Sequence, residues 1–173
     1  MAQKVVIMES VRGIVEYVLK SGSLDDRFMS IRRAMEGTIA HGRLQKDNEN
    51  IYENYQKEVK LQWGFVRDDI ELIIEGRTDG IIKERDIIVI EEISLIYIEE
   101  DYNELHWAQG KFYGYIYCKE NNLAEIRIRL SYYNLNTDEV KSFEKKFKLT
   151  ELEVFVSELV ERYMKAAFLK IAL

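Results

Sequence analysis

The chain has 173 residues, of which 47% are hydrophobic, and this is enough to build one core, so we expect a single domain spanning residues 1–173. No apolar run is long enough to cross a bilayer and the N-terminus lacks a signal-peptide pattern, so we expect a soluble, cytoplasmic protein with no membrane partner. The net charge of -6 disfavours a protein that coats nucleic acid through its overall field, but allows a local basic groove. The single cysteine, Cys118, excludes an internal disulfide and an iron–sulfur cluster.

A short apolar segment at residues 5–8 precedes the first predicted helix. Ser10 is a good N-cap for this helix and Gly22 a good stop signal. The residues between them are spaced so that one helix face is apolar, formed by Val11, Ile14, Val15 and Val18. The pattern therefore predicts an amphipathic helix.

A second helix is predicted to open near Asp25 or Asp26 and to end at the polar cluster of residues 46–50. It places Gly37 and His41 one turn apart. Taken alone, His41 is more simply explained as a hydrogen-bonded histidine beside small residues than as a metal ligand.

Strict alternation then predicts strands near 57–66, 71–83 and 87–96, the last two joined by a hairpin turn in the sequence KERD. A hairpin centred on that turn places Asp79 opposite Ile90 and makes Glu92 its diagonal neighbour. An acidic insert, EEDYNE, leads from the third strand into a helix over residues 105–118.

The last third of the chain predicts two more strands and a long helix. The strands lie near 123–133 and 140–149 and are joined by the turn NTDE. Thr150 and Glu153 form a capping-box pair at the start of a helix that reaches about Ile171. The whole order predicts an α/β fold with a mixed central sheet flanked by helices.

Two acids are predicted to converge within this sheet. Side chains alternate along a strand, so Asp79 and Glu92 can approach each other across the hairpin. Two carboxylates beside a core repel each other unless a cation or a shared proton compensates them, and oxygen ligands of this kind suit Mg²⁺ or Mn²⁺. The alternative is that Asp79 lies in a turn and Glu92 pairs with Arg77.

The predicted helix over residues 105–118 has a polar and aromatic stripe where an ordinary docking helix would be aliphatic. Its members recur at three and four positions: His106, Gln109, Tyr113 and Tyr117. Gln109 could orient a phosphate or a water, and Tyr113 could hydrogen-bond or stack; the alternative is a half-buried face with satisfied polar tips.

Three segments are candidate basic patches: Arg32 with Arg33, Arg127 with Arg129, and residues 141–148. Each is individually more simply explained as a solvated face.

Four short motifs occur in order: Gly37-x-x-x-His41, GRTD ending at Asp79, EEIS containing Glu92, and Gln109-x-x-x-Tyr113. The array resembles the RecB-like branch of the PD-(D/E)XK nuclease superfamily, and the order of the predicted elements agrees. It looks most similar to the nuclease domain at the front of some DinG-like bacterial helicases, where VRGIVEYVLKSGSLDDRF, EGRTDGI, HWAQGKFYGYIY and LSYYNL have counterparts. The resemblance covers nearly the whole chain and implies a restriction-endonuclease-like core.

The resemblance also implies roles for individual residues. The implied ligands of a Mg²⁺ or Mn²⁺ cofactor are His41, Asp79, Glu92 and the backbone carbonyl of Ile93. Gln109 and Tyr113 would position the DNA strand or the attacking water. The implied reaction is metal-dependent hydrolysis of phosphodiester bonds, by an exonuclease-like module for DNA repair or processing.

The chain departs from the family where the catalytic lysine should stand, two residues after the second acid. Ser94 occupies this catalytic position, and a hydroxyl can donate a hydrogen bond but brings no positive charge. Neither nearby lysine is a convincing substitute, because Lys111 should point away from the Gln109 face of its helix and Lys83 lies toward the turn.

Two functions therefore remain open. One is a nuclease acting on single strands or ends of DNA, weakened by Ser94; the other is a catalytically inactive nuclease-fold domain that binds nucleic acid or serves as an interaction module. The chain has no GxxxxGKS or GxxxxGKT phosphate-binding loop, so it is not itself a helicase. A helicase domain within a longer protein is a candidate partner.

Overall fold

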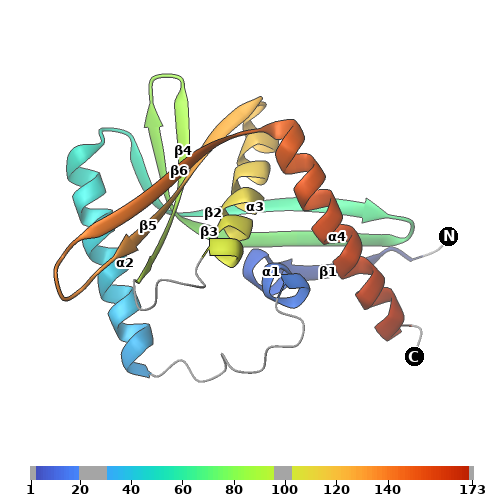
Figure 1. The fold of residues 1–173 in the computed structure, drawn as a ribbon. Coiled ribbons are helices and arrows are strands. Elements are labelled where there is room, and N and C mark those ends of the chain that lie inside the picture. Colours follow the sequence, from blue (N-terminus) through green and yellow to red (C-terminus); the bar gives the residue numbers. More distant parts are fainter. Residues whose placement is uncertain (1–2, 20–30, 96–102, 172–173) are drawn as a thin grey trace.

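The computed structural model describes residues 3–19, 31–95 and 103–171 (Figure 1). The strands are β1 (Val5–Ser10), β2 (Tyr55–Arg67), β3 (Ile70–Glu84), β4 (Ile87–Leu95), β5 (Glu125–Tyr133) and β6 (Val140–Lys148). The helices are α1 (Val11–Leu19), α2 (Ile31–Ile51), α3 (Asn103–Asn121) and α4 (Leu149–Ile171). No helix in the described ranges is long and apolar enough to cross a membrane.

The described strands form one six-stranded mixed sheet. Its order is β1-β3-β4-β5-β6, and β2 pairs with the other edge of β3. The β1–β3 and β4–β5 pairs are parallel, and the remaining pairs are antiparallel. The predicted α/β layout with a mixed sheet is confirmed, as are the four strands expected at 57–66, 71–83, 87–96 and 123–133, within the residues described.

Strand β3 changes its partner part-way along one edge. Antiparallel β2 follows the other edge of β3 for most of its length. Along the edge that β2 does not occupy, β1 pairs with residues 70–75 and β4 pairs with residues 80–84. Residues 76–79, between these two partners, therefore lie where the sheet splits, and Asp79 is the last residue before β4 joins.

Helices cover both faces of the sheet (Figure 1). Helices α1, α3 and α4 pack together on one face, and their buried residues join the sheet in the main core, which includes Ile14, Phe112 and Val156. Helix α2 lies on the other face, where Ala40 and Leu44 form a smaller cluster with Ile93 and Tyr133. The split in β3 is thus accessible to residues of α2 from one face and of α3 from the other.

The apolar start of the chain is a strand, which the sequence pattern did not predict. Residues 5–10 form β1, which pairs in parallel with residues 70–75 of β3. The segment is too short to show a clear alternation of apolar and polar residues. Only its pairing with a distant strand defines it as a strand. Helix α1 follows directly, and the Ser10 Oγ accepts a 2.8 Å hydrogen bond from the Gly13 amide, so the predicted N-cap is confirmed. The predicted stop at Gly22 and start near Asp25 or Asp26 lie outside the described residues.

Helix α2 continues through residues 46–50, where the polar cluster was expected to end it. The prediction was wrong because some of these polar side chains face the sheet rather than solvent. Asn48 is buried and donates a 2.6 Å hydrogen bond to Glu91. Polar groups that find partners on a sheet stabilise a helix there as apolar groups would.

The predicted register of the β3–β4 hairpin was wrong by two residues. Glu84 pairs with Ile87, so the turn contains only Arg85 and Asp86, and Arg85 adopts a left-handed conformation with φ of 53°. Gly80 pairs with Glu91, and extending this register by one residue sets Asp79 opposite Glu92 rather than Ile90. The two acids are therefore closer than predicted.

The remaining predictions concern the last helices. Helix α3 extends the predicted range of 105–118 at both ends, and most of the acidic insert before it lies outside the described residues. Helix α4 begins at Leu149, one residue before the predicted cap at Thr150. Glu153, the other half of that predicted capping box, forms an ion pair with Lys119 of α3 at 3.7 Å.

Candidate metal centre

Asp79 and Glu92 meet at the split between β3 and β4. The Asp79 Oδ2 accepts a 2.7 Å hydrogen bond from the amide of Ile93. The Glu92 Oε2 accepts hydrogen bonds from the Thr78 hydroxyl at 2.9 Å and from the Asp79 amide at 3.2 Å. These reciprocal bonds hold the two carboxylates in place from both strands, and they exclude the alternative in which Glu92 pairs with Arg77 within the described geometry.

Both carboxylates are in an environment that disfavours their charge. Burial raises the pKa of Asp79 to about 6, although the neighbouring His41 and the Ile93 amide oppose the rise. Burial, and then the proximity of Asp79, raise the pKa of Glu92 well above its ordinary value. In the described part of the chain, no lysine or arginine lies within ion-pair distance of either acid. An added cation would therefore stabilise the charged forms.

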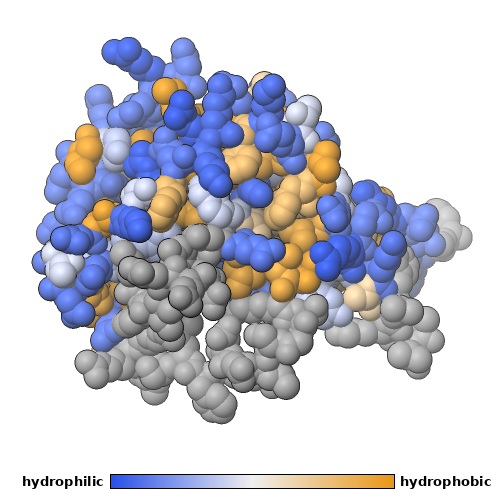
Figure 2. Space-filling view, viewed as in Figure 1, coloured by the Kyte–Doolittle hydropathy of each residue, from blue (hydrophilic) through white to orange (hydrophobic). Residues whose placement is uncertain are grey.

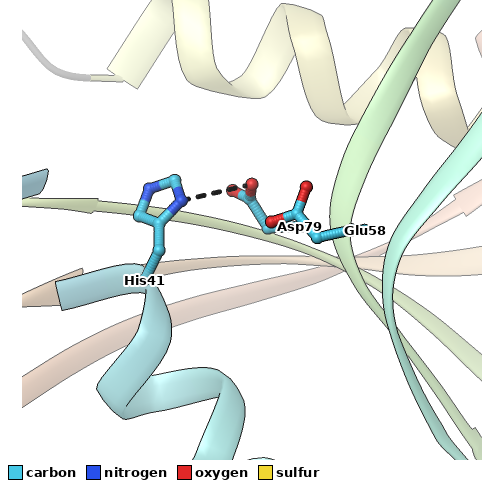
Figure 3. Close-up of side chains that lie close together, drawn as sticks. All are labelled: His41, Glu58 and Asp79. Atoms are coloured by element: carbon cyan, nitrogen blue, oxygen red, sulfur yellow. Dashed lines mark ion pairs between the residues drawn. The ribbon is translucent and has the colours of Figure 1, made fainter. Parts of the chain in front are cut away.

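His41 approaches Asp79 from α2, as Figure 3 shows. Its Nδ1 lies 3.5 Å from Asp79 Oδ1, and the two side chains are 33% and 17% exposed, so the group is open to solvent. The position of His41 depends on the helical spacing of the α2 residues that face the sheet. Gln45, one turn after His41, donates hydrogen bonds to the Asp79 carbonyl at 3.0 Å and to Glu58 at 2.9 Å.

Glu58 is a candidate site residue that the sequence reasoning missed. The ligand atoms of His41, Glu58 and Asp79 all lie within 4.8 Å of one another (Figure 3). The residues flanking Glu58 pair with those flanking Asp79, so the two acids lie opposite each other across β2 and β3. Glu58 has a left-handed φ of 52°, so its strand is locally irregular. Simple alternation made it a surface residue, and only the pairing register could have shown its position.

Two other predicted site residues come from α3. Tyr113 is buried, and burial, then the charges of Glu92 and Asp79, raise its pKa. The Tyr113 ring also covers Gly76, where an added Cβ would lie 2.5 Å from the hydroxyl oxygen. Gln109, one turn earlier, is half-buried. Its role in positioning DNA or water stays a prediction.

Ser94 is half-buried on β4 and pairs with Tyr132 of β5. Lys111 does point away from the acids, because its Nζ lies 4.5 Å from the Phe155 ring centroid and 5.4 Å from that of Phe147. Lys83 lies 5.9 Å from the Tyr117 ring centroid, toward the hairpin end. Neither lysine replaces the missing charge in the described geometry.

The donor set fits a hard divalent cation. It combines the imidazole of His41 with the carboxylates of Glu58 and Asp79, whose ligand atoms lie within 4.8 Å of one another. Glu92 adjoins this set, because its carboxylate accepts a hydrogen bond from the Asp79 amide. A site of carboxylate oxygens with a single imidazole and room for water suits Mn²⁺ or Mg²⁺, whereas structural zinc sites are rich in sulfur ligands. The buried like-charged pair supplies the reason for a cation to bind. The Ile93 carbonyl as a further ligand remains a prediction.

Comparisons with known proteins place the fold. No family model and no curated protein matches the chain. The crystal structure of SSO0001 aligns with a TM-score of 0.57 at 16% identity, covering 89% of this chain and 75% of that one. The structure of LHK-Exo in complex with dAMP aligns with a TM-score of 0.50 at 12% identity, covering 97% and 94% of the two chains. A structure of the same alkaline exonuclease from Laribacter hongkongensis aligns at 0.42, with 11% identity and coverage of 92% and 83%.

The fold is therefore the restriction-endonuclease-like nuclease fold, with a central six-stranded mixed sheet flanked by helices. At these identities the likeness is one of fold. It agrees with the resemblance to the nuclease superfamily seen in the sequence, while the finer similarity to DinG-like helicases stays a prediction.

Proposed function

We propose that this protein is a Mg²⁺- or Mn²⁺-dependent deoxyribonuclease that hydrolyses phosphodiester bonds, acting in an exonuclease-like manner in DNA repair or processing. One observation carries the proposal: the half-buried carboxylate of Asp79 and the buried carboxylate of Glu92 meet at the split of the sheet, with His41 and Glu58 beside Asp79. Exonuclease structures of the same fold support the assignment. The LHK-Exo complex with dAMP shows a nucleotide bound to a protein of this fold, which supports DNA as the partner.

The chain's own residues supply the positioning in this reaction. His41, Asp79 and Glu92, with Glu58, would hold the metal ion, which when bound polarises a phosphate and lowers the pKa of a water. The hydrogen bonds from Thr78 and from the Ile93 amide keep the two carboxylates from turning away. Gln109 and Tyr113 border the site from α3 and would orient the strand or the attacking water.

The resemblance to helicase-associated nuclease domains adds a finer proposal, in which the chain acts beside a helicase domain in a longer protein. It rests on the sequence motifs alone. Fusion or co-purification with a helicase would extend the function, but hydrolysis does not depend on it.

A cleavage assay tests the proposal directly. Labelled single-stranded and double-stranded DNA are incubated with Mg²⁺, with Mn²⁺ and with a chelator, and the products are resolved by length. We expect cleavage only with a divalent ion, and its loss in Asp79→Ala and in Glu92→Gln. Glu84→Gln, an exposed change at the hairpin end of β3, is the control and should cleave normally. Cleavage that persists in Asp79→Ala would refute this site.

One observation favours a second function. Ser94 stands in the position of the catalytic lysine, and among the described residues no lysine or arginine lies within ion-pair distance of the two acids. A nuclease fold without that charge could bind nucleic acid, or serve as an interaction module, without cutting. In that case the assay shows DNA binding and no products with either metal.

A further inference from the structure

Strand β6 forms an edge of the sheet and has two chemically different faces. The residues facing α3 alternate between lysine and phenylalanine: Lys141, Phe143, Lys145 and Phe147. Contacts establish this face, because Lys145 and Phe147 both lie against Trp107 of α3, and Phe143 lies against Tyr132. We call these four side chains, with Trp107 and Lys111 of α3, the β6 stripe.

The β6 stripe lies in line with the candidate metal centre. Across β4, β5 and β6, Glu92 pairs with Leu130 and Leu130 with Phe143. Likewise, Ser94 pairs with Tyr132, and Tyr132 pairs with Lys141. Paired residues share a face, and neighbouring strands are about 4.8 Å apart, so the stripe begins about 10 Å from Glu92. It then continues along β6 for about 20 Å, at about 3.3 Å per residue.

The rings of the β6 stripe are partly open to solvent. Phe143 is 36% exposed, with its ring edge-on to Tyr132 at 6.1 Å. At the far end of the stripe a hollow of about 380 Å³ is lined by Trp107, Lys111, Lys145, Phe147 and Phe155, with Glu104 at its side. Figure 2 shows hydrophobic residues exposed among hydrophilic ones on this side of the molecule, over α3 and α4.

The charges on the two faces of β6 differ. On the α2 face, Lys146 pairs with Glu125 at 3.1 Å, and Arg127 and Arg129 both pair with Glu144. On the stripe, none of Lys111, Lys141 and Lys145 has an acidic partner within ion-pair distance among the described residues, and each lies over an aromatic ring. Within the basic patch predicted at 141–148, Lys146 is thus paired with an acid on the α2 face, whereas Lys141 and Lys145 on the stripe are not, and the side chains of Arg32 and Arg33 lie outside the described residues.

We propose that the β6 stripe binds single-stranded nucleic acid, with bases stacked on Phe143 and Trp107 and phosphates beside Lys141 and Lys145. This deepens the proposed function, on which its link to cleavage rests. Alternating cations and exposed rings are what binding of unpaired strands requires, since every base offers a π-face and every linkage a negative charge. In a duplex the base faces are already stacked, so the stripe selects an unpaired strand.

Binding without cleavage tests the inference. Fluorescence anisotropy of a labelled oligothymidylate is measured in EDTA over a series of salt concentrations. Lys141→Ala with Lys145→Ala should weaken binding and reduce the salt slope by about 1.4, at roughly 0.7 for each phosphate that a lysine no longer neutralises. Lys146→Ala with Lys148→Ala removes the same charge from the other face of the strand, and should leave both nearly unchanged.

A second variant tests stacking separately from charge. Phe143→Ala should weaken binding by about 5- to 150-fold, since stacking contributes roughly 1–3 kcal/mol per base, while Phe143→Tyr should bind normally. Oligothymidylate should also quench the fluorescence of Trp107 in a Trp63→Phe background, whereas heparin, a polyanion without bases, should not.

The outcomes separate this inference from the proposed function. Three results would each overturn the role of the stripe, even if the protein cuts DNA. These are equal effects of the two double-lysine variants, unchanged binding in Phe143→Ala, and tighter binding of duplex than of single strands. Binding that follows the predicted pattern, in a protein that never cleaves with Mg²⁺ or Mn²⁺, would support the stripe and refute the nuclease.

Discussion

Ser94 is the position at which a substitution should raise the rate of the proposed reaction. It follows Glu92 by two positions on β4, so the two side chains share a strand face, and it brings no charge to a site with two acids. Removing one preorganised contact to a transition state lowers a rate by about 10²- to 10³-fold. Ser94→Lys should therefore raise cleavage toward that of a lysine-bearing enzyme, measured as a metal titration at constant ionic strength.

Ser94→Met is the matched control, because it adds comparable length without charge. A rise in Ser94→Met equal to that in Ser94→Lys would show that bulk rather than charge matters. No rise in either variant would indicate that another group already supplies the charge.

Glu58 should contribute to metal affinity. Its carboxylate lies with the side chains of His41 and Asp79 in one cluster, so Glu58→Gln should weaken Mn²⁺ binding by about 10- to 100-fold. Glu53→Gln, at an exposed position before β2, removes the same charge away from the cluster and is the control. Calorimetric titration with Mn²⁺ measures both without requiring activity. Equal affinities would remove Glu58 from the site.

Cys118 should resist alkylation in the folded protein. The side chain is fully buried on α3, and burial raises the pKa of its thiol to about 11. A raised pKa keeps the thiol protonated, so at pH 8 only about one molecule in a thousand carries the reactive thiolate, and the reaction accelerates only as the pH rises toward 11. Mass spectrometry after iodoacetamide treatment should show labelling in urea and almost none without it. Rapid labelling of the native protein at pH 8 would contradict the buried position.

At the scale of elements, Gly76 on β3 lets α3 approach the sheet. A Cβ at this position would lie 2.5 Å from the Tyr113 hydroxyl, whereas at Gly42 on α2 it would meet nothing within 4 Å. Gly76→Ala should therefore destabilise the protein by about 1–3 kcal/mol through overpacking. Gly42→Ala should stabilise it by about 0.5–1 kcal/mol, because alanine loses less backbone entropy in a helix.

Urea unfolding followed by circular dichroism compares the two glycine variants. Gly76→Ala should also displace Tyr113, and so alter DNA cleavage beyond its effect on stability. Equal stability changes in the two variants would contradict the close packing of Tyr113 on β3.

At the scale of the whole molecule, a buried polar network joins α2 to the sheet on the face opposite α3. Glu91 is 1% exposed and accepts hydrogen bonds from Asn48 of α2 at 2.6 Å and from Ser131 of β5 at 2.7 Å, with Arg129 at 3.8 Å. The same helix carries His41 to the candidate metal centre. The network therefore couples the position of a proposed ligand to the packing of two layers.

Breaking this network should be costly. Glu91→Ala leaves Asn48 and Ser131 without their buried acceptor, while Arg129 keeps Glu144, and should lower the free energy of unfolding by about 1–3 kcal/mol. Glu144→Ala removes the more exposed partner of Arg127 and Arg129, and should cost about 1 kcal/mol or less. Denaturant unfolding measures both, and Mn²⁺ affinity should also fall in Glu91→Ala because α2 is less firmly held. A loss in Glu91→Ala no larger than in Glu144→Ala would show that the network does not join the layers.

Much of the fold and part of the site could be predicted from local pattern. The long alternating segments predicted β2 to β6, and the three- and four-residue spacing predicted α3, because these periods are properties of the backbone. Asp79, Glu92 and His41 were identified as candidates from residue type and order. Strand β1, the continuation of α2 through residues 46–50 and the hairpin register were not, because each depends on a partner far away in the chain.

The sequence by itself determined which residues alternate and which helix faces are apolar, and it shows acids and a histidine in an order that resembles that of a nuclease superfamily. Only the tertiary structure decided that Glu58 joins His41 and Asp79, and that Lys146 of β6 is paired with an acid while Lys141 and Lys145 on the other face are not, among the residues described. Pairing register and packing between layers place side chains that are distant along the chain, and no local period contains that information.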